Sequence, residues 1–500
     1  SDTDAQTNDV LPADILFQWL SFYGPREPSA IQQALGISAS NLDDLLAVLA
    51  EDQAVVIDLL TEHASSLQVC ERGNLEILLR MARAQRRPVF KALAIDRLPL
   101  FLAAWQGLTA PGKDIEDLRA RLDQLFGYPA MAELWEGQIL PARLTPYPSS
   151  WLDSLLQGSD LIWFGCGKRR LGFAFSDELE LFRDGAPQAA VAPARPVDLT
   201  HLFPREAGRY SLLEIMQYAH QGSAALTRTL WDLLWQGRVG NDSFAALRQG
   251  ILTRFAPVTP RDDRHRRALT GRSRWSLPKP FPGHWYALAA PVQEADPLVR
   301  MELAKDRVRQ LLKRYGILFR ELLSHERSSL QWGAVFKALR LMELSGEIIS
   351  GHFFEGIPGL QFMSYEAFRF LSASLPEDAV YWMNACDPAS LCGVQIEGLK
   401  TRLPSRTPTT CLVYRGASLV LVARRGGRAL QFHTPPDDPR LTDYLAFFKT
   451  LLGREFNPIK IITVETINGE PALESPYAPA LKTFGFTEYH KGLELVRKYT

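Results

Sequence analysis

The strongest local charge in the sequence is a run of arginines in residues 254–274, and the chemistry that it suggests is phosphate binding. Seven arginines stand there against only Asp262 and Asp263. A guanidinium group can donate two parallel hydrogen bonds to one phosphate, so such a run can follow a nucleic-acid backbone, with an affinity that falls as salt rises. An aromatic ring beside it could stack an unpaired base; a solvated loop is the alternative. The predicted DNA-binding residues are Arg254, Arg261, Arg264, Arg266, Arg267, Arg272, Arg274 and Trp275.

A smaller basic cluster, Lys168 to Arg170, follows Gly165-Cys166-Gly167 and could extend the same track. The phrase GCGK lacks the spacing of the GxxxxGK[ST] phosphate loop and the Ser or Thr that would bind magnesium, so we interpret it as a turn between two strands. No dinucleotide-binding, zinc-protease or nucleophile-elbow motif is present. The nine histidines are scattered singly, without partners at metal-ligand spacing. We expect no cofactor and no metal in this chain.

The composition limits the function classes further. Lys plus Arg (56) equals Asp plus Glu (56), which excludes a protein that holds nucleic acid through overall positive charge. The five cysteines form no CxxC pair, which argues against a zinc module or a disulfide framework and favours a reducing compartment. No signal peptide and no apolar run of roughly 18 residues is present. We expect a soluble, cytoplasmic protein whose residues 1–10 form a disordered lead-in.

The elements that must position these groups follow a pattern that occurs four times. An amphipathic helix ends in a short polar break, and a segment of alternating apolar residues follows at once. Helix, tight break and strand is the order of a winged helix, in which the third helix runs into a two-stranded wing. The irregular spacing of the copies indicates separate small modules rather than a solenoid. The four copies lie at residues 46–60, 152–167, 230–242 and 339–356.

Shorter signals predict the helices around these copies. Gly36 should end a second helix of the first module, and Ser38 or Ser40 should cap the third. In the fourth module Gly316 should stop a long helix that starts at Pro297, and Ser328 or Ser329 should cap the third. The other predicted segments are helices over 12–23, 29–35 and 319–324, a helical insert over 115–134, and an Ala/Pro-rich connector over 186–196.

After Leu371 the sequence changes character, because short β-rich runs over residues 379–433 are typical of a meander or a small barrel, and the tail then returns to α/β. The predicted fold class is mixed α+β and multi-domain, with tandem winged-helix modules followed by a small β-barrel and a terminal α/β segment. The predicted domains are 11–90 (winged helix 1), 91–206 (winged helix 2 with the helical insert and linker), 207–296 (winged helix 3 with the basic loop), 297–376 (winged helix 4) and 377–500 (β-barrel and α/β module).

The third helices test whether these modules read a DNA sequence, since reading the major groove calls for Arg, Lys, Asn or Gln facing the bases. The first, over 40–51, carries Asp43, Asp44 and Glu51 and no basic residue, so phosphate would repel it. A winged-helix transcription regulator is therefore disfavoured, and most modules are expected to be scaffolding or protein–protein surfaces. Trp231 and Trp235, four apart on an apolar stripe, are expected in the core.

Several long phrases resemble the C-terminal region of long bacterial large helicase-related (Lhr) proteins, and they stand in the order of that family from about Leu11 to the end. They are NLEILLRMARAQRRPVF (74–90), LPLFLAAWQGL (98–108), LWDLLWQGRVGNDSFAALR (230–248), SRWSL (273–277), LLKRYGILFREL (311–322), GEIISGHFFEGIPGLQF (346–362) and NACDPASLCG (384–393).

The resemblance implies an ATP-dependent 3′-to-5′ DNA helicase and translocase of DNA repair, bacterial and nucleoid-associated. Its motor, with ATP and Mg²⁺, would lie N-terminal to this chain, which fits the missing phosphate-binding motifs. The region seen here would then serve homo-oligomerisation, for example as a tetramer, and contact single-stranded or tailed DNA. No membrane partner is expected.

The resemblance also implies an alternative, a winged-helix DNA glycosylase that removes uracil. Such an enzyme needs a carboxylate or amide to place the attacking water next to a flipped base. Asp387, in the phrase Cys386-Asp387-Pro388, is the candidate catalytic residue. Its surroundings depart from the family pattern, with Ser390-Leu391-Cys392 where an Asn-Pro-aromatic run is more typical. The structural alternative for Asp387 is a turn or cap before Pro388.

Overall fold

A computed structural model of the chain describes residues 12–86, 90–183, 199–205, 207–256, 281–289, 296–490 and 492–497. The chain divides into two compact units, one of residues 1–91 with 341–347 and one of residues 92–340 with 348–500. None of the helices in the described ranges has the length and apolar character that crossing a membrane requires. The predicted connector over 186–196 lies outside the described residues.

The first unit has three helices followed by a hairpin, as its sequence predicted. Ser38 accepts a hydrogen bond from the backbone N–H of Asn41 and so caps the third helix, while Gly36 ends the second with a φ of +67°. Apolar residues of all three helices pack on Val55 and Val69 of the hairpin. The elements are α1 (Ala13–Leu20), α2 (Pro28–Leu35), α3 (Ala39–Glu51), β1 (Val55–Asp58), β2 (Gln68–Glu71) and α4 (Arg72–Arg86).

The second module repeats this order around a three-stranded sheet of order β3-β5-β4. The helical insert expected over 115–134 is wrong as one helix. Its first part ends at Gln124, Gly127 then takes a φ of +74°, and the chain enters β3, which pairs with β5. The elements are α5 (Leu98–Trp105), α6 (Ile115–Gln124), β3 (Ala130–Met131), α7 (Ala132–Leu134), the π-helix η2 (Trp135–Ile139), α8 (Leu140–Arg143), α9 (Ser149–Gly158), β4 (Leu161–Gly165) and β5 (Arg170–Phe175).

In the third module the two wing strands are far apart in sequence, because a further helix and residues outside the described ranges lie between them. The strands β6 and β7 nevertheless pair, with Asn241 opposite Trp285. Ser211 and Glu214 form a reciprocal capping box that fixes the start of the first helix. The elements are α10 (Leu212–Ala219), α11 (Ser223–Trp235), β6 (Val239–Asn241), α12 (Phe244–Leu252) and β7 (Trp285–Ala287).

The fourth module contains the predicted long helix, which Gly316 ends with a φ of +70°. Two local predictions are wrong. The helix expected over 319–324 is a 3₁₀ turn over 322–325, and the serines expected as caps lie in another 3₁₀ turn, so the third helix starts only at Trp332. The elements are α14 (Pro297–Tyr315), β8 (Ile317–Leu318), η4 (Leu322–His325), η5 (Ser328–Leu330), α15 (Trp332–Ser345), β9 (Ile348–Gly351), β10 (Gln361–Ser364) and α16 (Tyr365–Ser372).

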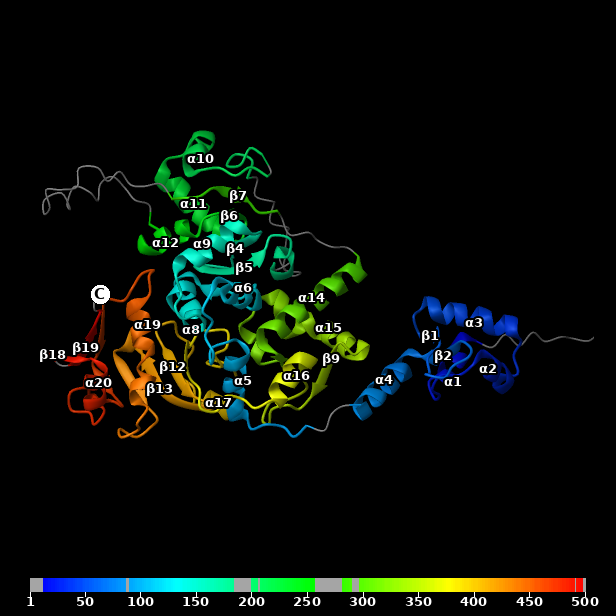
Figure 1. Cartoon of the computed structure of the whole chain (residues 1–500). Coiled ribbons are helices and arrows are strands. Elements are labelled where there is room, and N and C mark those ends of the chain that lie inside the picture. The colour runs from blue at the N-terminus through cyan, green and yellow to red at the C-terminus, as the bar shows by residue number, and fades with distance from the viewer. Residues whose placement is uncertain are drawn as a thin grey trace, which may run out of the picture. The chain divides into compact units, whose positions relative to one another are not determined.

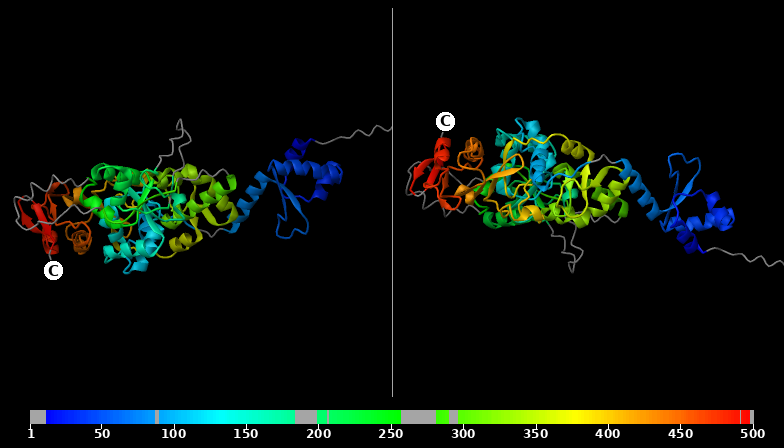
Figure 2. Two further views of the ribbon diagram at one scale, coloured as in Figure 1. Left: turned by 90° about the horizontal axis from the view of Figure 1, so that it is seen from above. Right: turned by 90° about the horizontal axis from the view of Figure 1, so that it is seen from below.

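The C-terminal region contains a six-stranded sheet of order β11-β12-β13-β14-β16-β17 and a three-stranded sheet of order β15-β19-β18. The six strands pair as an open ladder in the described residues, so closure into a barrel stays unconfirmed. Buried aromatic residues of α19 and apolar residues of both sheets form one core. The elements are β11 (Val380–Asn384), α17 (Glu397–Lys400), β12 (Cys411–Arg415), β13 (Ser418–Arg424), β14 (Ala429–Phe432), α18 (Leu441–Tyr444), α19 (Phe447–Gly453), β15 (Ile461–Val464), β16 (Thr466–Ile467), β17 (Glu470–Pro471), α20 (Ala478–Phe484), β18 (Thr487–Tyr489) and β19 (Gly492–Val496). In the three views of Figures 1 and 2, the red elements α20, β18 and β19 lie together.

Candidate nucleic-acid interface

The phrase GCGK forms the turn between the two wing strands of the second module, as predicted. The turn closes through a hydrogen bond from the Cys166 N–H to the Arg170 carbonyl, 2.8 Å long. Gly167 has a φ of +109°, which a residue with a side chain rarely adopts. Lys168, Arg169 and Arg170 are exposed on this turn. The wing tip therefore carries three cations on a fixed backbone.

The wing lies directly against the end of α11. A Cβ atom on Gly165 would lie 1.7 Å from the carbonyl oxygen of Leu234, so only glycine fits this approach. The N–H of Gly167 also donates to the carbonyl oxygen of Trp235 at 2.9 Å. The wing of the second module is thus attached, backbone to backbone, to the third helix of the third module.

A groove of about 710 Å³ opens at this junction. Its cations, Lys168 and Arg169 from the wing and Arg327 from the fourth module, outnumber its one carboxylate, Asp232. The remaining lining residues are Cys166, Gly167, Trp235 and Gln236. Three modules therefore meet around one basic groove, which we call the wing groove.

Positive charge also gathers behind the wing groove. The Arg183 guanidinium donates to the carbonyl oxygens of Gly237 (3.3 Å) and Ala289. Burial lowers the pKa of Arg183, and the charges of Arg327 and Arg238 lower it further, while Glu180 opposes them. Arg183 therefore lies close enough to Arg327, a residue of the groove, for the two charges to interact.

Arg254 is the one residue of the predicted basic track that lies in the described ranges, and it is next to the wing groove. It is exposed, and its carbonyl oxygen accepts a hydrogen bond of 3.3 Å from the Arg169 guanidinium. That guanidinium lies 5.4 Å from the ring centre of Phe255. The first residue of the predicted basic stretch therefore lies beside the wing. The other predicted DNA-binding residues, Arg261, Arg264, Arg266, Arg267, Arg272, Arg274 and Trp275, lie outside the described residues.

The tryptophans near the groove are mainly core residues. Trp231 and Trp235 lie in the core, as predicted; their rings stack at 5.5 Å, and Trp285 packs edge-on against Trp231 at 5.3 Å. Trp231 and Trp285 are almost fully buried, whereas Trp235 is 9% exposed and lines the groove. Of these three, only Trp235 presents a surface to the groove.

Asp387, the candidate catalytic residue, lies in the protein interior. Its side chain is 0% exposed, and its two carboxylate oxygens accept hydrogen bonds of 2.7 Å from the Arg143 guanidinium. The N–H of Ala389 also donates to it at 2.8 Å, and Gln106 accepts from Arg143 at 2.7 Å. This geometry supports a structural link between α8 and the C-terminal region. The catalytic role stays a prediction.

Sequence reasoning missed Arg327 and Arg183 as neighbours of the wing. Both belong to segments far from Lys168 in sequence, and neither stands in a basic run. The basic cluster at 168–170 was the one sequence signal for this groove, but it does not indicate which distant segments pack beside the wing.

Comparison with known families identifies two of the four modules. Residues 95–174 and residues 299–383 each match the winged-helix domain of the large helicase-related proteins. The first range lies within the predicted second module, and the second overlaps the predicted fourth module and extends into β11. The other two, around α3 and α11, have the same helix-to-strand order in the structure.

Two curated relatives match over nearly the whole chain. "Lhr helicase/uracil glycosylase" of Escherichia coli is 27% identical over 94% of this chain and 32% of its own length. "Lhr helicase/probable uracil glycosylase" of Mycolicibacterium smegmatis is 26% identical over 92% of this chain and 32% of its own length. The chain thus spans about a third of these relatives. The resemblance to the Lhr family, consistent with its C-terminal region, is confirmed.

Among solved structures, the Streptomyces sahachiroi DNA glycosylase AlkZ is similar to this chain, with a TM-score of 0.43 and 12% identity. The similarity covers 74% of this chain and 100% of that one.

Proposed function

We propose that this Lhr-type winged-helix region is the DNA-contacting and assembly part of an ATP-dependent 3′-to-5′ DNA helicase of DNA repair. The observation that carries the DNA contact is the wing groove, where three cations from two modules face one carboxylate. In this proposal the motor, with its ATP and Mg²⁺, belongs to another part of a longer protein, and this chain itself binds no cofactor.

Single-stranded DNA is the form that suits the wing groove. The third helix of the first module offers Asp43, Asp44 and Glu51 rather than base-reading cations, which disfavours docking in a major groove. The wing groove instead gathers cations that can bind successive phosphates, and Trp235, 9% exposed, lies in its wall; cations beside an aromatic side chain are the combination that single-strand binding uses. Each phosphate contact to a single strand contributes about −0.7 to the slope of log affinity against log salt.

The test is a salt titration of binding between the chain and a fluorescent (dT)12. We expect Lys168→Ala to weaken binding and to make the salt slope shallower by about 0.7. The matched control is Lys460→Ala, since Lys460 is exposed in the C-terminal region, away from the groove. Equal salt slopes for Lys168→Ala and the unmodified chain would contradict the proposal that the wing groove binds DNA.

Homo-oligomerisation is the second part of the proposal. The helix α4 keeps apolar side chains exposed, with Ile77 at 53% and Met81 at 56%, and such a face suits an interface with another copy. Light scattering should then give a mass well above 56.2 kDa for this chain. A monomer at micromolar concentration would contradict assembly and leave the DNA contact standing.

Uracil removal from DNA is the alternative function, favoured by the names of both curated relatives. The burial of Asp387 gives it no surface on which a flipped base could rest. Incubation of the chain with uracil-containing single-stranded DNA, followed by cleavage at abasic sites, tests the activity. Absence of product would exclude it, and product that persists in Asp387→Asn would move catalysis to another residue.

A further inference from the structure

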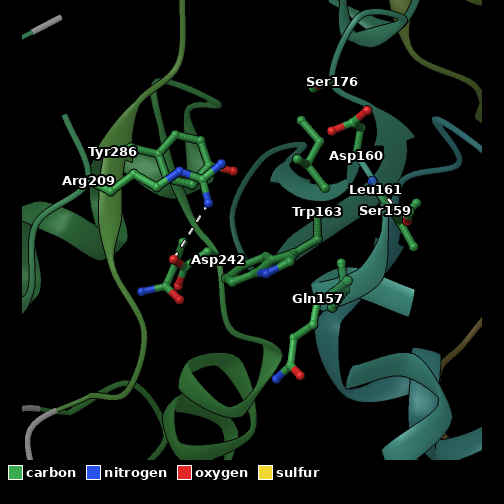
Figure 3. A pocket seen from close by; sticks show the side chains of 12 residues that line it. Gln157, Ser159, Asp160, Leu161, Trp163, Ser176, Arg209, Asp242 and Tyr286 are labelled. Carbon is green, nitrogen blue, oxygen red and sulfur yellow. Dashed lines mark hydrogen bonds and ion pairs between the residues drawn. The ribbon is translucent and has the colours of Figure 1, made fainter. Parts of the chain in front are cut away.

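A second cavity, of about 260 Å³, lies at the opposite end of β4 from the wing groove. The first half of β4 lines this cavity, whereas the residues that follow the strand line the groove. Its far wall comes from β6, β7 and the segment before α10. The lining residues include Gln157, Asp160, Trp163, Arg209, Asp242 and Tyr286. We call it the β4 pocket (Figure 3).

Aromatic rings form two sides of the β4 pocket. Trp163 is 1% exposed, and its indole N–H has no hydrogen-bond partner among the described residues, although a buried donor normally finds one. Figure 3 shows this indole between Arg209 and Asp242 on one side and Ser159 and Leu161 on the other. The wall of the pocket therefore contains a buried indole whose N–H donor has no partner among the described residues.

The opposite ring, Tyr286, is held by a cation. The Arg209 guanidinium lies 4.9 Å from its ring centre and 3.6 Å from the Asp242 carboxylate. Burial raises the pKa of Tyr286 to about 12, against the opposing charge of Arg209. The phenol is therefore a neutral hydrogen-bonding group at physiological pH.

Two carboxylates, Asp160 and Asp242, contribute acceptors to the polar lining of the pocket. Asp242 accepts from the backbone N–H of His284 at 2.7 Å and pairs with Arg209, which fixes its orientation. Asp160 stands exposed at the start of β4. A ligand that places amino donors toward these carboxylates and a ring acceptor toward the indole N–H would satisfy both kinds of group.

We propose that the β4 pocket binds one unpaired nucleobase that carries an exocyclic amino group, with cytosine preferred over thymine. The proposal rests on the proposed single-strand binding, to which it adds a base preference. Cytosine presents an amino donor where thymine presents a carbonyl oxygen, and carboxylates accept from that amino group. Thymine in the same position would bring its carbonyl oxygen against a carboxylate. The volume is slightly below the roughly 300–1,000 Å³ typical of small-molecule sites, which suits one base rather than a larger ligand.

The experiment compares (dC)12 with (dT)12 at pH 8, by competition against a fluorescent (dT)12 on the full chain. We expect (dC)12 to bind about fivefold to tenfold more tightly, the discrimination of one good base contact. Asp160→Asn should abolish this preference because its amide can also donate to thymine. Asp437→Asn, at an exposed position in the C-terminal region, should leave the preference unchanged.

Three outcomes decide the assignment. Equal affinity for the two oligonucleotides in the unmodified chain would overturn the base preference. A preference that survives Asp160→Asn would overturn its location in the β4 pocket. If the chain binds neither oligonucleotide, the proposed function fails, and calorimetric titration with dCMP against dTMP then tests the pocket alone: heat from dCMP only supports it, and no difference overturns it.

Discussion

The buried ion pair between Arg143 and Asp387 allows a quantitative prediction. Both side chains are 0% exposed, and two hydrogen bonds of 2.7 Å join them. Among the described residues, Arg143→Met would leave the Asp387 carboxylate buried with the Ala389 N–H as its remaining hydrogen-bond donor. Removing one member of a buried pair typically costs about 3–5 kcal/mol, because the other charge stays in the interior without compensation.

A double substitution separates the pair from its surroundings. In Arg143→Met with Asp387→Leu no charge remains uncompensated, so the loss should be smaller; it comes from the Ala389 N–H that loses its acceptor and the Gln106 oxygen that loses its donor. The double variant should therefore be more stable than either single variant. That ordering requires direct coupling between the two side chains.

Hydrogen exchange followed by mass spectrometry across a urea series provides the measurement. The free energy of opening should fall in peptides that span residues 139–147 and 384–392, while peptides of α1 to α3 keep theirs. A loss below about 1 kcal/mol in Arg143→Met, or losses that simply add in the double variant, would refute the reasoning. The same measurement must accompany any glycosylase assay of Asp387→Asn, since lost activity could reflect lost structure.

Three further predictions concern packing and pH. Burial and a neighbouring arginine lower the pKa of His325 below 6.5. The contribution of this histidine to stability is therefore present above pH 6.5 and is lost as pH falls through the lower folded-state pKa. In urea titrations, His325→Gln should show a smaller loss of stability between pH 7.5 and 5.5 than the unmodified chain. Gly165→Ala should destabilise the chain by about 1–3 kcal/mol or more, because the added Cβ would overlap a backbone carbonyl. Gly158→Ala, which has open space around it, should leave stability unchanged. Equal melting temperatures for the two variants would contradict the prediction. Arg248 donates to Glu136 at 2.7 and 2.9 Å, and burial already raises the pKa of Glu136. Arg248→Gln should raise this pKa further and so cost more stability at pH 8 than at pH 5. An equal loss of stability at both pH values would count against this prediction.

The parts of this fold that the sequence predicts are those set by local periodicity and turn chemistry. All four helix-to-strand junctions form where the apolar spacing changes from helical to alternating, and Gly36, Ser38 and Gly316 end or cap helices as expected. The GCGK phrase is a turn because glycine at position 167 permits a backbone conformation that closes the hairpin.

The remaining features depend on contacts between distant segments. The 3₁₀ turn at 322–325 stands where a helix was expected, in a stretch whose Leu322 and Leu323 are buried, and tertiary packing can override helical propensity there. No sequence feature near Asp387 predicts its ion pair with Arg143, and none near Lys168 predicts that Arg327 lies beside it. For this reason the basic track was predicted only where charges are consecutive, and the β4 pocket, assembled from separate strands and loops, was not predicted.

The link between α8 and the C-terminal region has a practical consequence for dissecting this protein into fragments. A truncation placed before Asp387 would leave the buried Arg143 guanidinium without its carboxylate partner. Such a fragment should express poorly even though its winged helices are intact. A cut close to residue 91, by contrast, falls near the boundary between the two compact units. Fragment design should therefore follow buried charges rather than the repeat pattern.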